Sequence, residues 1–243
     1  MATLALTFCG TWTFRRLLAL DSPPSVVILG MFLVILSGFS GAFLMTYLIN
    51  AVRLARSGLL ARLEGVSIVW ALVSGIGVAA VYCRWQRISL GRALDMAAPP
   101  AALGLAIGRL GCFAAGCCYG RPTDSWLGMY LPDENGVWMT RYPTQLMAFV
   151  ANLFIFLALL AVEQYGAQRA GAKRGWPFDG FLVLLGLFLY SLKRFGLAFL
   201  RQAGAFPMVG PLSWMHVSAL MGMGATATVM LWHLHRTWKG GKP

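Results

Sequence analysis

The feature that most constrains this chain is a series of apolar stretches, each about as long as a helix needs to cross a membrane. A bilayer core of about 30 Å requires roughly 20 apolar residues for each helical span. We therefore expect membrane-spanning helices at residues 26–50, 66–83, 94–115, 145–162, 180–200 and 212–233. The sequence predicts an all-α, polytopic membrane protein of about six transmembrane helices, with strand-like alternation only in the loop 119–140.

Composition supports this class of protein. Hydrophobic residues make up 58% of the chain and charged residues 12%, whereas soluble domains have about 25% charged residues. The mean hydropathy of +0.69 excludes a disordered chain and argues against a soluble enzyme. A net charge of +12 would suggest nucleic-acid binding in a soluble protein. Here the basic residues lie mostly between the apolar stretches, as in membrane-protein loops, so we expect no nucleic-acid partner.

The distribution of basic residues predicts the orientation. Eleven Lys and Arg residues outside the spans fall on one side of the membrane and six on the other, which places both termini in the cytoplasm. Residues 1–24 carry Arg15 and Arg16 after an apolar run, the reverse of a signal peptide, and we expect an amphipathic lead-in on the cytoplasmic membrane surface. Residues 25–236 then form a single transmembrane domain, and residues 237–243 a cytoplasmic tail.

Two arginines lie inside apolar helices. Arg109 lies in the third predicted span and Arg194 in the fifth, where a charged side chain costs at least about 2.5–3.5 kcal/mol unless it faces a polar partner or cavity. At 1.5 Å per residue, Arg109 is about 21 Å from Asp95 and Arg194 about 24 Å from Phe178, so the guanidiniums fall at similar depths. Because a guanidinium matches a phosphate, the pair predicts an anionic lipid ligand. Alternatively, each arginine reaches the interface or caps a helix.

Glycines and cysteines surround Arg109. Gly108 and Gly111 would leave room for a ligand beside it, although such spacing is also typical of helix packing. Cys112, Cys117 and Cys118 do not match a zinc pattern, and we expect neither a metal nor a cofactor. Cys117 is a candidate nucleophile if a guanidinium lowers the pKa of its thiol. Its alternatives are small apolar packing or a disulfide with Cys112.

Four segments together resemble the bacterial prolipoprotein diacylglyceryl transferases. Residues 108–121, GRLGCFAAGCCYGR, resemble the family signature G-R-x-G-N-F-I-N-G-E-x-x-G-R. Residues 141–146, RYPTQL, are similar to the family's R-H-P-S-Q-L, and residues 194–202, RFGLAFLRQ, to its R-x6-R-Q segment. Residues 95–99, DMAAP, resemble the D-x-x-A-P that opens the signature helix. These segments occur in family order from about Glu64 to the end of the chain.

The resemblance implies an enzyme of the bacterial inner membrane. Its relatives take phosphatidylglycerol from the outer leaflet, and a lipoprotein thiol displaces glycerol phosphate, so that the diacylglyceryl group ends on sulfur. Arg109 and Arg194 match the family's essential arginines, and Asp95 matches a retained position. The residues we expect to bind the lipid, or to line its site, are Arg109, Arg194, Arg201, Arg121, Arg141, Gln145, Gly108, Gly111, Cys112 and Gly120.

The sequence departs from the family at its acid–base positions. The family's His-Gly-Gly reads Val69-Trp70-Ala71 here. The two asparagines of the family signature are replaced by Cys112 and Ala115, and three acids of the family motifs are replaced by Cys117, Ala148 and Ala198. Tyr119, Tyr142 and Cys117 therefore remain as catalytic candidates beside the two arginines. We expect a transferase that uses phosphatidylglycerol or another anionic phospholipid as donor for a periplasmic acceptor, which is a protein, a glycan or a lipid. The alternative is a non-catalytic phospholipid-binding protein that acts with a partner.

Overall fold

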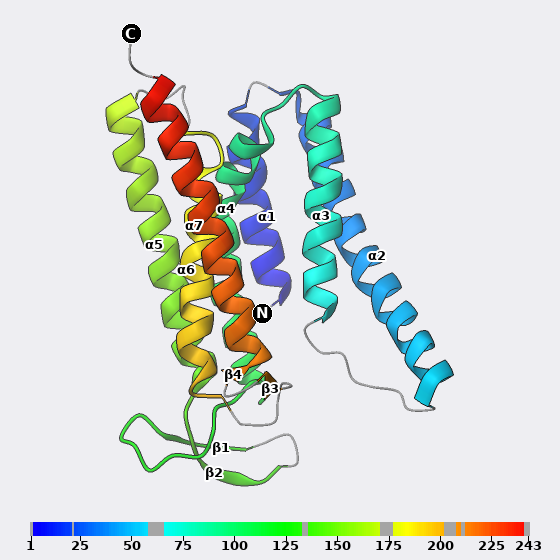
Figure 1. Cartoon of the computed structure of the whole chain (residues 1–243), viewed down its shortest axis with the longest axis vertical. Helices are drawn as coiled ribbons and strands as arrows, with labels where there is room; N and C mark the ends of the chain where they lie inside the picture. The colour runs from blue at the N-terminus through cyan, green and yellow to red at the C-terminus, as the bar shows by residue number, and fades with distance from the viewer. Residues whose placement is uncertain are drawn as a thin grey trace. The chain divides into compact units, whose positions relative to one another are not determined.

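The computed structural model describes residues 2–20, 22–57, 66–132, 136–170, 177–201, 208–209 and 212–240. This part of the chain is mostly helical and confirms the predicted all-α, polytopic class (Figure 1). Its helices are α1 (Ala2–Leu18), α2 (Pro24–Ser57), α3 (Val66–Trp85), α4 (Leu90–Ala114), α5 (Thr144–Ala170), α6 (Phe181–Ala198) and α7 (Trp214–Gly240).

Five helices in the described part are long and apolar enough to cross a membrane. These spans are Pro24–Leu48, Leu90–Ala114, Thr144–Gln168, Phe181–Ala198 and Trp214–Thr237. The remaining predicted span corresponds to α3, whose apolar stretch Trp70–Trp85 is shorter. Large apolar side chains on α2 point outward, and Phe32 and Phe43 are 59% and 72% exposed. Such exposure suits contact with lipid chains rather than with water.

Two short antiparallel hairpins accompany the helices. β1 (Met129–Pro132) pairs with β2 (Trp138–Arg141), with Met129 opposite Arg141. This hairpin lies in the loop where the sequence shows strand-like alternation. β3 (Met208–Val209) pairs with β4 (Leu212–Ser213), and the sequence gives no sign of this pair because two residues are too short for alternation to show.

The chain divides into two compact units, residues 14–93 and residues 1–13 with 94–243. In the first unit, α2 and α3 pack through small residues. The Ser74 hydroxyl donates to the Ser37 carbonyl oxygen at 2.8 Å, and the Tyr82 hydroxyl donates to the Val26 carbonyl oxygen at 2.8 Å. Close approach through small residues is typical of helix pairs in membranes.

The second unit has its core between α4, α5 and α6. Ala102, Ile155, Leu159 and Leu182 form this core, and Leu159 is only 1% exposed. A Cβ atom at Gly186 would lie 3.3 Å from Leu159, so this glycine lets α5 and α6 approach closely.

The first part of α1 packs inside the second unit. Cys9 is buried and its sulfur faces Gly104 in the middle of α4. The Trp12 ring meets the Phe156 ring of α5 edge to face, with 5.8 Å between centroids. Cys9 and Trp12 thus contact α4 and α5, and the location of residues 1–24 on the cytoplasmic membrane surface stays a prediction. The boundaries at residues 25 and 236 stay predictions.

Asp95 joins the beginnings of α4 and α6. Its side chain is 8% exposed, and its carboxylate accepts hydrogen bonds from the backbone N–H groups of Gly180 at 2.7 Å and Val183 at 2.9 Å. A carboxylate at a helix N-terminus satisfies free N–H groups and interacts favourably with the helix dipole. Asp95 lies in the first half of α4, but it caps α6.

Candidate anion-binding site

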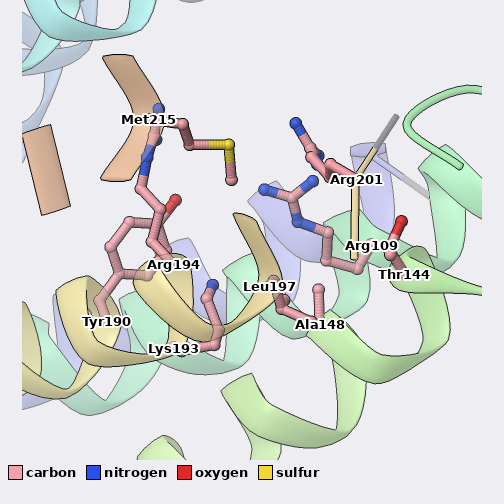
Figure 2. A pocket seen from close by; sticks show the side chains of 9 residues that line it. All are labelled: Arg109, Thr144, Ala148, Tyr190, Lys193, Arg194, Leu197, Arg201 and Met215. Carbon is pink, nitrogen blue, oxygen red and sulfur yellow. The ribbon is translucent and has the colours of Figure 1, made fainter. Parts of the chain in front are cut away.

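A pocket lies in the second unit where α4 and α6 end and where α5 and α7 begin (Figure 2). It is open to solvent, and the space between its walls together with that opening is about 370 Å³. The residues that line it are Arg109, Thr144, Ala148, Tyr190, Lys193, Arg194, Leu197, Arg201 and Met215. The structure thus brings Arg109 into one pocket with Arg194 and Arg201, although Arg109 is far from the other two in the sequence.

The cap formed by Asp95 explains why two of these arginines lie at the same height. Arg109 follows Asp95 by 14 residues, and Arg194 follows Gly180 by 14 residues. The hydrogen bond between Asp95 and Gly180 holds these two starting points together. Arg109 then lies about 21 Å beyond Asp95 along α4, and Arg194 lies about 21 Å beyond Gly180 along α6.

Four cationic side chains line the pocket. Lys193, which the sequence analysis does not single out, joins the three arginines, and none of the described lining residues is Asp or Glu. In Figure 2, Arg109 and Arg201 lie on one side and Arg194 on the other, with Lys193 between them. Like charges gathered in a partly closed site repel one another, and a bound anion removes this repulsion. The arrangement suits a phosphate group.

Lys193 is held in place by two neighbours. Its ammonium donates a hydrogen bond to Asn152 Oδ1 on α5 at 2.8 Å, and its Nζ lies 3.8 Å from the centroid of the Tyr190 ring. Asn152 is only 1% exposed. An ammonium has three N–H donors, so two remain for a ligand. The sequence could have indicated Lys193 as a site residue, because it lies next to Arg194 within an apolar span, where charged side chains are rare.

Arg194 also has an unused donor. Its Nε is buried and has no hydrogen-bond partner among the described residues. An unsatisfied buried donor costs about 1–3 kcal/mol, more for a charged group. A phosphate oxygen in the pocket would supply the missing acceptor.

Several sequence-predicted residues surround this end of the unit without lining the pocket. Arg141 is 2% exposed, and its guanidinium carbon lies 4.9 Å from the centroid of the Tyr119 ring. The guanidinium carbon of Arg121, whose side chain is exposed, lies 6.0 Å from the centroid of the Tyr142 ring. Gln145 is buried, and its Nε2 donates to the Cys117 carbonyl oxygen at 2.8 Å.

The predicted glycines have different surroundings. A Cβ atom at Gly120 would lie 2.6 Å from the Tyr142 carbonyl oxygen and 2.7 Å from that of Leu200. Only glycine therefore lets the loop and the end of α6 meet here. A Cβ atom at Gly108 would meet nothing within 4 Å, which agrees with open space beside Arg109.

The candidate proton-transfer groups differ in their electrostatics. Burial, followed by the nearby thiols of Cys118 and Cys112, raises the pKa of the Cys117 thiol to about 12. Cys117 would need a lowered pKa to act as a nucleophile, whereas its surroundings raise the pKa of this thiol. Hydrogen bonding with Thr123, then with Ser125, and the nearby Arg121 lower the pKa of Tyr142. Tyr142 is therefore the better placed of the two to lose a proton.

Comparison with known proteins identifies the family of this chain. The sequence profile of the prolipoprotein diacylglyceryl transferases matches residues 1–232, so the likeness includes α1 as well as the segments after Glu64. Phosphatidylglycerol–prolipoprotein diacylglyceryl transferase of Thermosynechococcus vestitus is 28% identical over 97% of this chain and 86% of its own length. Proteins of the same name from Dehalococcoides mccartyi and Geobacter sulfurreducens are 33% and 36% identical over 60% and 54% of this chain. The matched parts span 53% and 46% of those two proteins.

Proposed function

The chain belongs to the prolipoprotein diacylglyceryl transferase family, and on that premise we propose that its pocket binds the phosphate of phosphatidylglycerol or of another anionic phospholipid. The protein is a membrane-embedded transferase that passes the diacylglyceryl group, or the head group, of this donor to an acceptor. The observation that carries the proposal is the convergence of four cations in one pocket whose described lining contains no carboxylate.

The charge of the phosphate changes during transfer of a diacylglyceryl group. The acceptor's nucleophile bonds to the glycerol carbon, the bond from that carbon to the phosphate oxygen breaks, and glycerol phosphate leaves with the bonding electrons. The donor phosphodiester carries one negative charge, and the departing monoester carries up to two. Arg109, Arg194, Arg201 and Lys193 therefore stabilise the transition state more than the bound donor, which is the condition for catalysis.

The acceptor must lose a proton during the same reaction. The described residues that line the pocket include neither a carboxylate nor a histidine. We assign this step to Tyr142, because the pKa of its hydroxyl is lowered, in preference to Cys117. Tyr119, whose ring lies against Arg141, is the second candidate. A protein thiol, a sugar hydroxyl, an amine or another lipid fits as the acceptor.

One observation favours a second candidate function. Ala148 lines the pocket at a position where the family motif has an acid. A pocket that keeps the cations and lacks this acid suits a non-catalytic phospholipid-binding protein that acts with a partner. Lipid binding and turnover must therefore be measured separately.

The charge distribution supports a location in the bacterial inner membrane with the pocket facing the periplasm. The C-terminal end of α7 lies at the opposite end of this helix from the pocket residue Met215 (Figure 1), on the side that the loop charges predict to be cytoplasmic. Cys9 contacts Gly104, which lies about 15 Å along α4 from the end of that helix at the pocket. The Trp12 ring contacts Phe156, which lies about 18 Å along α5 from the start of that helix at the pocket. The first part of α1 therefore lies alongside the middle of α4 and α5. The cytoplasmic location of both termini stays a prediction from the loop charges.

The proposal is tested with the 243-residue chain purified in detergent and incubated with isotope-labelled phosphatidylglycerol and a membrane extract. Mass spectrometry should detect released glycerol phosphate and a labelled acceptor, and Arg109→Ala should abolish both. Arg236→Ala is the matched control, because Arg236 packs on Trp232 in the distal part of α7. Retained lipid that depends on Arg109, without turnover, would favour the binding protein. The proposal would be overturned if the protein showed no turnover and also retained no lipid in a manner that depends on Arg109.

A further inference from the structure

Three thiols gather where α4 ends, Cys112 in the last turn of the helix and Cys117 and Cys118 in the loop that follows, and the proposed transfer reaction does not use them. The sulfur atoms of Cys112, Cys117 and Cys118 all lie within 4.8 Å of one another. Each of the three is a free thiol and is partly buried. Their spacing in the sequence predicts no metal site, because it lacks the paired ligands of a zinc motif. The fold nevertheless brings them together.

The loop reaches this arrangement through an unusual backbone. Gly116 and Cys118 have φ angles of 65° and 62°, in the left-handed region. For a residue other than glycine this conformation costs about 1–2 kcal/mol, and such strain is commonly found at functional sites. The turn carries the chain back on itself, so that the Cys117 N–H donates to the Cys112 carbonyl oxygen at 3.1 Å.

Two buried side chains at the start of α5 fix the loop. The Thr144 hydroxyl donates to the Cys118 carbonyl oxygen at 2.7 Å, and Gln145 Nε2 donates to the Cys117 carbonyl oxygen at 2.8 Å. Both side chains are 2% exposed. The backbones of two of the three cysteines are therefore held before any ligand arrives, as in sites whose ligands are positioned by surrounding hydrogen bonds.

We propose that Cys112, Cys117 and Cys118 form a three-sulfur site for a soft metal ion, with Cu⁺ as the ion that fits best. Thiolates select Cu⁺ and Zn²⁺. Zn²⁺ takes four ligands, whereas the described residues supply three to this cluster. With metal–sulfur bonds of about 2.3 Å, three sulfurs around one ion lie about 4 Å apart, so only small side-chain movements are needed. On binding, the three thiols release their protons to solvent and each sulfur bonds to the ion.

The test uses the full chain, purified under anaerobic, reducing conditions and titrated with Cu⁺ in competition with a chromophoric Cu⁺ chelator. One Cu⁺ should bind per chain, with X-ray absorption showing three sulfur neighbours at about 2.3 Å. Replacing any one of the three cysteines with serine should weaken binding by at least about 100-fold, beyond the 10–100-fold typical of outer-shell changes. Cys83→Ala is the control, because Cys83 lies on α3, and it should bind Cu⁺ as the unaltered chain does.

A second measurement needs no variant and so does not depend on variants folding. Cu⁺ should protect Cys112, Cys117 and Cys118 of the unaltered protein from iodoacetamide, as quantified by peptide mass spectrometry, without changing the labelling of Cys9 and Cys83. Failure to protect all three, or fewer than three sulfur neighbours in the absorption spectrum, would overturn the proposal. A disulfide among the three that persists under these conditions and leaves no Cu⁺ bound would also overturn it.

Discussion

The ammonium of Lys193 donates a hydrogen bond to Asn152 Oδ1 over 2.8 Å, which ties α6 to α5 beside the pocket. A free lysine side chain carries about 2 kcal/mol of rotamer entropy, and ordering it on ligand binding would reduce affinity. Asn152 and the Tyr190 ring hold the ammonium in advance. Lys193 is therefore a preorganised member of the cationic group.

Replacing Lys193 tests whether this fourth cation contributes to the reaction. Lys193→Met keeps an unbranched chain of similar length and removes the charge. Because Lys193 faces charge that develops on the phosphate, turnover should fall by about 100- to 1,000-fold, the usual effect of removing one such donor. The measurement is kcat/KM for phosphatidylglycerol, with Arg236→Ala alongside as the control. Unchanged turnover in Lys193→Met would place Lys193 outside the reaction.

Asn152 should act through Lys193 rather than on the lipid itself. Asn152→Leu removes the acceptor of the ammonium and should lower kcat/KM in the unaltered background but have little further effect in Lys193→Met. Hydrogen bonds to charged groups are worth about 1.5–3 kcal/mol, so a double-mutant cycle should give a coupling energy of that size. Strictly additive effects would show that Asn152 has a role of its own.

Removing the Asp95 carboxylate should destabilise the second unit. In Asp95→Ala, the backbone N–H groups of Gly180 and Val183 lose their acceptors, and the free energy of unfolding should fall by about 1–3 kcal/mol. Asp95→Asn keeps one acceptor oxygen, so its free energy of unfolding should lie between those of Asp95→Ala and the unaltered chain. Thermal unfolding in detergent measures the loss, with the exposed Asp124 replaced by Ala as the control. If Asp95→Ala melts as the unaltered chain does, the cap does not hold α4 and α6 together.

Much of the fold was predictable because membrane insertion depends on the length and apolarity of a segment, which are local properties. The equal depth of Arg109 and Arg194 was predictable for a similar reason, since rise per residue is fixed in a helix. The structure adds the physical link between their helices, the capping of α6 by Asp95.

Features that depend on helix rotation or on single backbone angles could not be read from the sequence. The pairing of Lys193 with Asn152 requires that two particular faces of α5 and α6 meet. The cysteine cluster requires the left-handed angle at Cys118, which residue type does not indicate. The packing of α1 depends on Cys9 fitting against Gly104, a match of shapes that hydropathy does not report.

Adding a methyl group at two glycines near the site should change the stability of the protein in opposite directions. Gly120→Ala places a Cβ against two backbone carbonyl oxygens and should lower both stability and lipid binding. Gly108→Ala meets no atom within 4 Å and lies within a helix, where alanine is favoured over glycine by about 0.5–1 kcal/mol.

Gly108→Ala should therefore keep or raise the melting temperature while it weakens lipid binding, if the open space beside Arg109 is where the lipid lies. Gly224→Ala on α7, which also meets nothing within 4 Å, is the control for a harmless helical substitution. Equal lipid binding in Gly108→Ala and Gly224→Ala would mean that the lipid does not use this space.

The pH dependence of turnover tests the assignment of the proton acceptor to Tyr142. A base works in its deprotonated form, so turnover should rise with pH until the hydroxyl has lost its proton. Because hydrogen bonding with Thr123 lowers the pKa of Tyr142, this rise should be centred below the ordinary tyrosine value of about 10. Thr123→Val removes the largest cause of the shift and should move the rise to higher pH.

Tyr142→Phe should abolish the rise and leave slow turnover that does not follow this titration. Arg121→Ala should move the rise in the same direction as Thr123→Val, since the charge and the hydrogen bond of Arg121 also lower the pKa of Tyr142. Lipid retention measured at each pH separates an effect on binding from one on proton transfer. A pH profile of Tyr142→Phe that coincides with that of the unaltered chain would assign the proton to another group, with Tyr119 the next to be replaced.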